Sequence, residues 1–339
     1  MVRSLEVRPL DAGDAAACGA LLAARHRADA ERLPFLEPRL GEPAVAAEAV
    51  RAVLGRPMAQ GAVAVRGERV VGYCAGVVQS FSPRDLAAQF LPLRAAAVPS
   101  AGHAVDPAED AVAVYRLLYA ALAEGWVRDG VLVHRIDVPA GDRAVEEAWL
   151  TLGFGRVMTA ATRRTGEPVE GASSGSVRVD VATAEDFAVV QRLSRELAAH
   201  HRRAPMFWPD VGEAAPAMDG FLRAALGGSV PTFLAWEGSR AVGMQVFLDP
   251  GFTPDVVRQE QRLYLFEGVV SEAVRGGGVG TALLRASMAW AAEHGRELCT
   301  LHWAAGNFSG APFWLGHGFV PVEHTMERRI DERALWGRG

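Results

Sequence analysis

A glycine-rich turn in the second half of the chain carries the clearest chemical signature. Arg275 is followed by four glycines among the five residues 276–280, between a predicted strand over 263–270 and a predicted helix over 281–294. The first amides of a helix lack internal hydrogen-bond partners, and the helix dipole adds positive charge at that end. Glycines also let the backbone approach a ligand closely. The pattern predicts an anion site suited to a diphosphate, and a plain strand-to-helix turn is the weaker alternative.

Two familiar phosphate-binding loops do not fit this turn. A dinucleotide-binding loop needs the spacing G-x-G-x-x-G, with an acidic residue about 20 positions later. A P-loop needs a lysine, and all 35 basic residues of this chain are arginine. The anion therefore belongs to another class of ligand, and no step can depend on a lysine side chain.

Glu267 and His302 are the candidates for proton transfer. Glu267 lies between Phe266 and Gly268 in an apolar strand, where a carboxylate is uncommon unless it is paired or functional. It could act as a general base, and the alternatives are a solvent-facing carboxylate or a partner for an arginine. Gly268 predicts a bulge that would splay the sheet. His302 could supply a proton, although a histidine packed along a strand is the commoner case.

Two arginine-rich loops could line one binding cleft. The first runs from Arg25 to Arg39, and the second runs from His200 to Asp210 and contains aromatic residues among its arginines. Such loops could bind a small polar molecule, and surface loops that pack on the other half are the alternative. The paired histidines lack HExxH spacing and the three cysteines form no C-x-x-C pair, so no metal site is expected.

Composition limits the class of protein. The chain has 339 residues, of which 50% are hydrophobic and 22% are charged, so it can bury a core and is long enough for two domains. Its net charge of −5 argues against a general nucleic-acid binder. The sequence contains no apolar run of about 18 residues and no apolar signal core, so we expect a cytoplasmic protein with no membrane partner.

The elements that position these residues repeat across the chain. Each half is predicted to run strand, helix, hairpin, strand, helix, strand, helix, strand, as in α/β or α+β folds with a partly parallel, mixed sheet. The segment 149–154 matches 314–319, because both begin with Trp-Leu and end with Gly-Phe. The polar stretch 165–176 is predicted to be a linker. The predicted domains are therefore 1–164 and 177–339, each with its own splayed sheet.

The second half resembles the GNAT superfamily of N-acetyltransferases. The R-x-x-G-x-G pattern from Arg275 to Gly280 is similar to the loop by which that family holds the diphosphate of coenzyme A, and Asn307 and Phe313 continue its downstream pattern. The first half resembles the family in layout and in its Trp149 segment. The resemblance implies a tandem GNAT protein with two acyl-CoA N-acyltransferase domains. It implies the following residues for binding coenzyme A: Val269, Val270, Arg275, Gly276, Gly277, Gly278, Val279, Gly280, Thr281, Asn307 and Phe313.

The resemblance also implies a reaction, in which acetyl-CoA or another acyl-CoA donates its acyl group to an amine. Glu267 would take the proton of the amine, and the N–H of Val270 would stabilise the oxyanion. The chain departs from the family at Trp314, where a tyrosine usually protonates the leaving thiolate, because an indole N–H offers no such proton. Either the thiolate leaves unassisted or another group serves, and His302 is the candidate.

The expected function is therefore N-acetylation of a small-molecule amine, with secondary metabolism as one setting. The alternative from another class is a non-catalytic protein that binds or senses acyl-CoA, which the missing tyrosine favours.

The equivalent loop of the first half, 103–110, lacks the arginine and the glycines. It places Asp106, Glu109 and Asp110 where a diphosphate would lie. These carboxylates would repel an anion, and they would complement the dipole of the helix that follows. We expect a degenerate loop in a domain that serves as a scaffold or substrate wall. The alternative is coenzyme A bound there through backbone amides alone.

Overall fold

The computed structural model describes residues 4–172, 175, 177–249 and 252–336. The predicted linker falls partly outside the described residues, at 173–174 and 176. No helix in the described ranges is long and apolar enough to cross a membrane.

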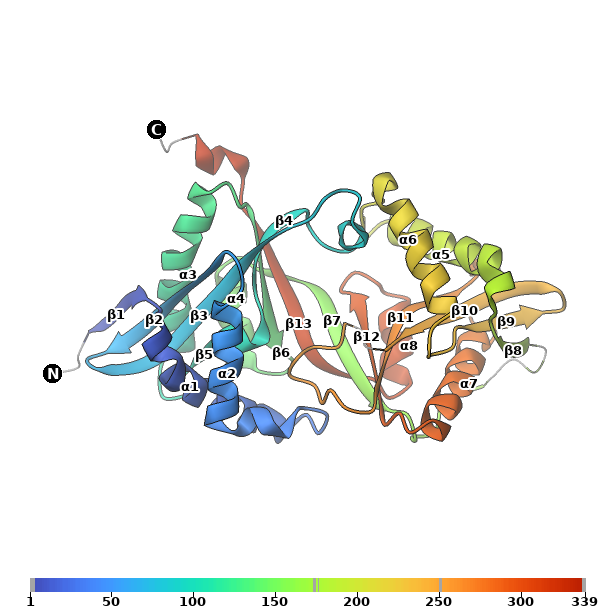
Figure 1. Cartoon of the computed structure of the whole chain (residues 1–339), viewed down its shortest axis with the longest axis horizontal. Coiled ribbons are helices and arrows are strands. Elements are labelled where there is room, and N and C mark those ends of the chain that lie inside the picture. The colour runs from blue at the N-terminus through green and yellow to red at the C-terminus, as the bar shows by residue number, and fades with distance from the viewer. Residues whose placement is uncertain (1–3, 173–174, 176, 250–251, 337–339) are drawn as a thin grey trace.

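The elements follow the same order in both halves of the chain, except that the first half has an additional short strand at His103–Val105 (Figure 1). The strands are β1 (Leu5–Pro9), β2 (Ala59–Arg66), β3 (Arg69–Ser80), β4 (Arg94–Val98), β5 (His103–Val105), β6 (Val133–Pro139), β7 (Gly155–Arg164), β8 (Val177–Val181), β9 (Phe233–Glu237), β10 (Arg240–Leu248), β11 (Arg262–Val270), β12 (Leu298–Ala304) and β13 (Val320–Arg329). The helices are α1 (Ala15–Ala30), α2 (Pro43–Leu54), α3 (Ala111–Arg128), α4 (Arg143–Thr151), α5 (Phe187–His201), α6 (Ala215–Leu226), α7 (Val279–Glu293) and α8 (Gly310–Gly316).

This order confirms the predicted mixed α/β fold and adds one helix to each half. The helices α2 and α6, which precede the hairpins, are absent from the predicted order. Pro43 and Pro216 lie in the first turns of these helices. At these positions no N–H is bonded within the helix, so the missing N–H of proline costs nothing, and the fixed φ of proline suits a helix. Both hairpins turn at a glycine with positive φ, Gly67 at 67° and Gly238 at 58°, as their sequences predict.

The strands form one mixed sheet of 13 strands in the described chain, rather than one separate sheet for each half. Its order is β1-β2-β3-β4-β6-β13-β7-β12-β11-β10-β9-β8, with β5 paired to β3. The two halves exchange their last strands at the centre: β13 pairs with β6 of the first half, and β7 pairs with β12 of the second. Antiparallel pairing of β13 with β7 joins the two halves, as Figure 1 shows.

Helices cover both faces of each half of the sheet. In the first half α3 and α4 pack on one face around Trp126 and Trp149, whereas α1 and α2 form a separate core around Leu22 and Tyr73. In the second half α7 and α8 cover one face, and α5 and α6 pack on β10 and β11. This leaves the middle of the sheet, where the exchanged strands lie, between two groups of helices.

The described part of the predicted linker is packed rather than loose. Val169 is 8% exposed and belongs to the apolar core of the second half. Arg285 of α7 donates hydrogen bonds to the carbonyls of Val169 and Gly171 at 2.9 and 3.0 Å. These residues of the predicted linker therefore pack on the second half, because one valine and the backbone acceptors anchor a stretch that is polar in composition.

Candidate active site

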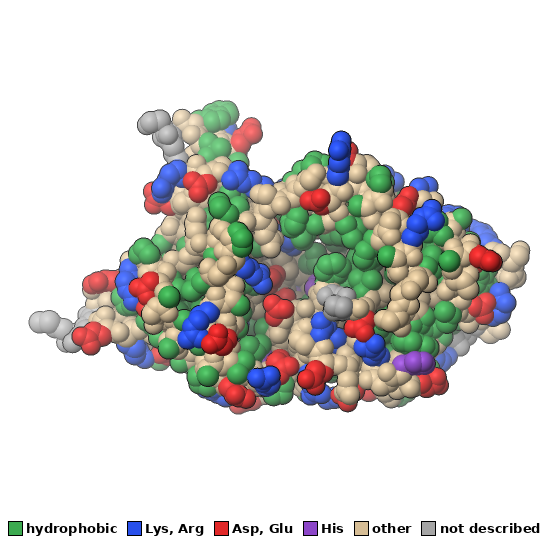
Figure 2. All heavy atoms as spheres, viewed as in Figure 1, with side chains coloured by type: hydrophobic (Ala, Val, Ile, Leu, Met, Phe, Trp, Pro, Cys, Tyr) green, Lys and Arg blue, Asp and Glu red, His purple; other side chains and the backbone are tan. Residues whose placement is uncertain are grey.

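A cavity of about 1480 Å³ lies between the two halves, and residues of both halves line it. The space-filling view shows the molecule hollowed between its two lobes (Figure 2). Its walls include the glycine-rich turn, the strands β11 and β12, the helix α5 and the segment 86–91 of the first half. A cavity of this size, with a few polar groups among apolar walls, is typical of a small-molecule site.

The sheet opens into a wedge beside this cavity. Strand β11 pairs in parallel with β12 only from Arg262 to Leu265, while its later residues pair with β10 alone. The bulge occurs at Phe266, the extra residue opposite the Val246–Phe247 step of β10. The predicted splaying is therefore present, but the bulge does not lie at Gly268. Gly268 has another role, because a Cβ there would approach the Trp314 ring at 3.1 Å.

The backbone of Val270 is available at the open end of the wedge. Ser271 N–H bonds to the carbonyl of Val242 on β10 at 2.8 Å. Successive residues of a strand point their N–H groups to opposite edges, so the N–H of Val270 points away from β10 and toward the wedge. This orientation suits the predicted role as an oxyanion donor.

The glycine-rich turn has the geometry of an anion site. Gly276 and Gly278 have φ values of 79° and 81°, which favour glycine over other residues. Gly278 is the N-cap of α7, and none of the described side chains caps that helix start. A Cβ on Gly280 would lie 3.1 Å from the Phe313 ring, so this glycine keeps the first turn of α7 close to α8. The first amides of α7 are thus left for a ligand.

The structure brings all the predicted coenzyme A-binding residues to this one cavity. The turn from Arg275 to Thr281 lines it, as do Val269, Val270, Asn307 and Phe313. Three of these side chains, Arg275, Thr281 and Asn307, also have hydrogen-bond partners within the protein. Asn307 Oδ1 accepts hydrogen bonds from Ser309 Oγ at 3.0 Å and from the N–H of Gly310 at 2.9 Å, which caps α8.

Glu267 lies in the same cavity and is 6% exposed. Its Oε1 accepts a hydrogen bond from Ser194 Oγ of α5 at 3.0 Å, and its Oε2 has no partner among the described residues. Burial raises the pKa of Glu267 to about 7, and the hydrogen bond from Ser194 opposes that rise. A carboxylate that titrates near neutrality, has one oxygen without a partner and belongs to a cavity wall can accept a proton from a bound molecule.

His302 also lines the cavity, but it is suited to a different task from the one predicted. Burial, together with the charge of Arg135, lowers the pKa of His302 to about 4, so the ring is neutral at neutral pH. Its Nδ1 lies 2.9 Å from the hydroxyl of Tyr264 on β11, and Tyr264 is 5% exposed. A neutral imidazole is a poor source of a proton, whereas a tyrosine hydroxyl held by it can donate one.

Tyr264 is the functional candidate that the sequence analysis missed. It lies three residues before Glu267 and lines the cavity. The sequence gives one indication of this role, a tyrosine with its polar hydroxyl within an apolar strand. Its histidine partner is 38 residues away in the sequence. Burial raises the pKa of Tyr264 above its ordinary value, so the hydroxyl keeps its proton until a base takes it.

The first half contributes to the cavity through a segment other than the predicted one. The loop from Arg25 to Arg39 does not line the cavity. It pairs with the second half through Leu36 and Val257, and the Arg25 side chain donates to the carbonyl of Ser100 at 2.7 Å. Arg25, Arg27 and Arg32 thus all have partners within the first half.

The segment 86–91 forms the first-half wall instead. The ring of Phe90 contacts Phe266 of β11 and Trp208 edge-on, with centroids 5.5 and 6.4 Å apart. Gln89 Nε2 donates to the carbonyl of Val211 at 2.9 Å. The loop from His200 to Asp210 lies opposite, and its residues His200, His201, Trp208 and Asp210 line the cavity as predicted, whereas Phe207 is 73% exposed.

Side chains occupy the equivalent positions of the first half. Asp106 pairs with Arg69 at 2.7 Å, and Glu109 pairs with Arg66 at 2.6 Å. Asp110 caps α3 by accepting a hydrogen bond from the N–H of Ala113 at 3.2 Å. All three predicted carboxylates therefore lie at this helix start and have partners of their own.

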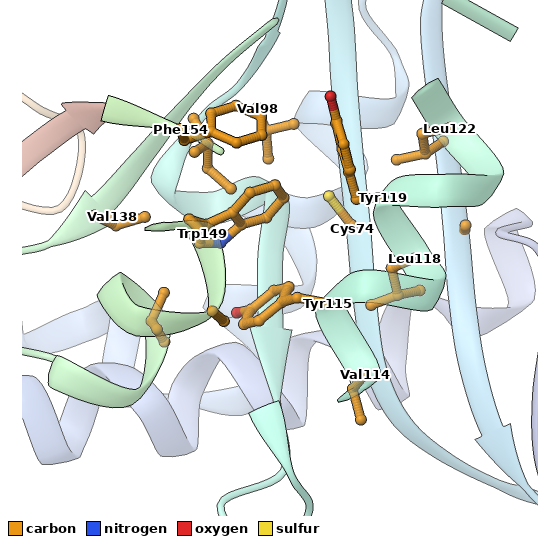
Figure 3. Packing of buried hydrophobic residues seen from close by; sticks show 14 of the residues in the cluster. Cys74, Val98, Val114, Tyr115, Leu118, Tyr119, Leu122, Val138, Trp149 and Phe154 are labelled. Atoms are coloured by element: carbon orange, nitrogen blue, oxygen red, sulfur yellow. The ribbon is translucent and has the colours of Figure 1, made fainter. Parts of the chain in front are cut away.

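Aromatic rings fill the space behind this first-half loop. Tyr115 of α3 and Trp149 of α4 lie against each other with centroids 5.2 Å apart, as Figure 3 shows. The hydroxyl of Tyr115 lies 2.8 Å from His103 Nδ1, and His103 Nε2 lies 2.9 Å from the carbonyl of Asp137. Tyr115, Trp149 and His103 are all buried.

Comparisons with known proteins agree with this geometry. Residues 195–319 match the sequence model of the acetyltransferase (GNAT) family. No curated protein sequence shows significant similarity to the chain. A crystal structure of a GCN5-related N-acetyltransferase from Sphaerobacter thermophilus matches with a TM-score of 0.60 and 16% identity, over 96% of each chain.

Two further solved structures match more weakly. A GCN5-related glucosamine N-acetyltransferase region of a fungal multi-domain GH3 β-N-acetylglucosaminidase matches with a TM-score of 0.53 and 11% identity, over 96% of this chain and 38% of that one. A tandem GNAT protein from the clavulanic acid biosynthesis pathway matches at 16% identity over 96% of this chain and 98% of that one, but its TM-score of 0.48 is too low to support an inference. The second half of the chain therefore carries the sequence signature of the GNAT family of acetyltransferases over residues 195–319, and the first half has a similar order of elements.

Proposed function

We propose that the protein transfers an acetyl group, or a close acyl relative, from coenzyme A to the amine of a small molecule. The observation that carries this proposal is Glu267, a buried carboxylate with a free oxygen and a pKa near 7, in the same cavity as an uncapped glycine-rich helix start. The helix start is suited to binding the diphosphate of the donor, and the carboxylate is suited to accepting a proton from an amine. We also propose that the protein acts in the cytoplasm, with 1–164 and 177–339 as its two domains.

The proposed reaction divides the work among three groups. The carboxylate of Glu267 takes a proton from the acceptor ammonium, and the freed nitrogen attacks the thioester carbonyl. The N–H of Val270 stabilises the oxyanion that forms. The C–S bond then breaks, and the thiolate of coenzyme A takes a proton from the Tyr264 hydroxyl, which His302 holds at 2.9 Å.

The acceptor test is direct. The purified chain is mixed with acetyl-CoA and single amines, and release of the coenzyme A thiol is followed together with the mass of the product. Acetylated amine supports the proposal. A non-catalytic acyl-CoA sensor is the second candidate, because Trp314 occupies the place of the family's tyrosine. It would bind acetyl-CoA with no amine-dependent release of thiol.

Tyr264→Phe tests whether Tyr264 protonates the leaving thiolate of coenzyme A. We expect turnover to fall by about 10²-fold or more, the usual contribution of a general acid, while binding of acetyl-CoA is unchanged. Trp314→Phe is the matched control, because it removes an indole N–H that offers no proton and keeps most of the ring packing against Gly268. A steady-state assay in which Tyr264→Phe retains full turnover while Trp314→Phe loses it would reverse these roles.

We expect one coenzyme A for each chain. In the first half the loop carboxylates are paired with Arg66 and Arg69, and the space behind them holds Tyr115 and Trp149. A second donor would have to displace these partners. Native mass spectrometry with acetyl-CoA counts the bound molecules. Two equally occupied sites would show that the first-half loop binds the donor through its backbone despite its carboxylates.

A further inference from the structure

The floor of the cavity is a row of side chains on the central sheet. His302 of β12 lies opposite Ala160 of β7, which in turn lies opposite Glu323 of β13. In the next row Thr325 of β13 lies opposite Asp137 of β6. Residues directly opposite each other on paired strands point to the same face. The exchanged strand β13 therefore places Glu323 on the same cavity face as His302, and all of these residues except Ala160 line the cavity.

Glu323, which is buried, and Asp137, which is partly buried, form a pair of carboxylates on this floor. Glu323 is 7% exposed, and its Oε2 accepts a hydrogen bond from Ser100 Oγ. Asp137 Oδ1 accepts a hydrogen bond from Thr325 Oγ1 at 2.7 Å. The second oxygen of each carboxylate has no hydrogen-bond partner within the described part of the chain.

The protein compensates the charge of this pair only in part. Burial raises the pKa of Glu323, and the neighbouring Asp137 raises it further. Asp255, at the exposed edge of the cavity, acts on both carboxylates in the same direction. Arg25 and Arg135 oppose these effects, but Arg135 also lies 3.7 Å from Glu327 and Arg25 also lies 3.8 Å from Asp29. The pair is therefore suited to an organic cation that enters the cavity.

We propose, on the basis of the acetyl transfer proposed above, that the acceptor carries a second cationic group, held by Glu323 and Asp137 while its reacting amine meets Glu267. Two independent observations support this assignment. Glu267 lines the cavity and its buried Oε2 has no partner in the described chain, and the Glu323–Asp137 pair lines the same cavity without a full set of partners.

The sheet sets the length of such an acceptor. Three strand spacings separate β11 from β13, through β12 and β7, and each spacing is about 4.8 Å where the strands are paired. Because Glu267 lies beyond the last β11–β12 pair, the separation there is at least about 14 Å. The two carboxylate side chains and the ion-pair contacts take up part of this distance. The two positive groups of the acceptor therefore lie at least about 10 Å apart, as in a long linear diamine or polyamine.

This assignment also accounts for the use of both halves in one site. Glu267 comes from the second half, Asp137 from the first, and Glu323 from the strand that crosses between them. A single half could bind the donor and hold the base, but it would lack the second cation site.

The test compares matched amines in the thiol-release assay with the full chain and acetyl-CoA. Octamethylenediamine has the proposed span, octylamine has the same chain without the second charge, and putrescine is too short. We expect kcat/KM to be at least about 10-fold higher for octamethylenediamine than for either other amine, because a buried charge pair contributes strongly to binding. Equal use of octamethylenediamine and octylamine, or a preference for putrescine, would overturn the proposal.

Two variants assign the effect to the floor of the cavity. Glu323→Gln and Asp137→Asn keep their size and hydrogen bonds, and each is expected to raise KM for octamethylenediamine by about 10-fold or more while leaving octylamine unchanged. Glu68→Gln, in the exposed β2–β3 turn, removes the same charge from the surface and should change neither. An unchanged ratio of the two amines in Glu323→Gln contradicts the proposal.

The cation site can be tested even if the protein does not transfer an acetyl group. If no amine releases the thiol, the proposed function is wrong, and calorimetry of octamethylenediamine with the chain and coenzyme A decides on the cation site alone. Binding that is lost in Glu323→Gln supports the site. Absence of binding, or binding that Glu323→Gln leaves unchanged, rules the site out.

Discussion

Replacing Gly278 with aspartate is expected to abolish binding of acetyl-CoA, with a loss of affinity of at least about 100-fold. Gly278 is the N-cap of α7, with a φ of 81°. Aspartate is a favourable N-cap residue and one of the side chains that best tolerates left-handed φ, so the helix should still form. Its carboxylate would then occupy the place of the diphosphate, and two like charges in contact cost several kcal/mol.

Gly238→Asp is the matched control for this experiment. Gly238 also has a left-handed φ, of 58°, and its Cβ would meet open space in the β9–β10 turn. The control therefore carries the same new charge and a similar backbone strain, away from the cavity. Calorimetry should show wild-type affinity for Gly238→Asp and no binding for Gly278→Asp. Equal affinity of the two variants would show that the donor binds elsewhere.

Glu267→Gln is expected to reduce turnover by about 10²- to 10⁴-fold, the usual contribution of a general base. Glutamine keeps the size of the side chain and the contact with Ser194 Oγ, but it has no basicity. Binding of acetyl-CoA should change little, because the glycine-rich turn holds the donor. The steady-state rate with any accepted amine, at matched acetyl-CoA saturation, measures the loss. A variant with wild-type turnover would remove Glu267 from the mechanism.

The pH dependence of the reaction provides a second test of the same residue. The pKa of Glu267 is about 7, and only the ionised form can take a proton, so kcat/KM should rise with pH through about 7 and then level off. The Glu267→Gln variant should lack this limb. Ser194→Ala should move the midpoint to higher pH, because the hydrogen bond from Ser194 favours the ionised carboxylate. A midpoint that stays in place in Ser194→Ala contradicts this account.

Stability measurements separate loss of chemistry from loss of fold. The pKa of Glu267 is raised from 4.5 to about 7, so the folded chain loses stability as pH rises from about 4.5 to about 7, where the unfolded chain has released this proton and the folded chain still holds it. Glutamine removes that cost, which is about 3 kcal/mol at most. Glu267→Gln should therefore unfold at the same temperature as the wild type below about pH 4, and at a higher temperature above pH 7.

The sequence predicts best those parts of the site that depend on short segments of chain. The turn from Arg275 to Gly280 needs only a strand before it and a helix after it, and the spacing of its glycines is enough to indicate an anion site. Glu267 stands out because a carboxylate in an apolar strand is unusual. Both predictions concern residues close together in the chain, and both lie in the cavity where they were expected.

The features that depend on distant pairings could not be predicted in the same way. The last strands of the two halves have similar patterns, so the sequence does not reveal that β7 and β13 exchange places. The contact between Tyr264 and His302 depends on the register of β11 with β12. The Arg25–Arg39 loop resembled a binding loop because of its arginines, whereas the apolar segment that carries Phe90 forms the wall instead.

A crystal structure of the full chain with bound acetyl-CoA is the most direct test of the proposed donor site and mechanism. The account predicts one donor molecule for each chain, with its diphosphate on the amides of the Arg275–Thr281 turn. Its thioester should lie in the wedge between β11 and β12, within hydrogen-bond distance of the N–H of Val270 and facing Glu267. A donor bound at the Asp106–Asp110 loop of the first half, or a thioester outside the wedge with Glu267 pointing away from it, would contradict the account.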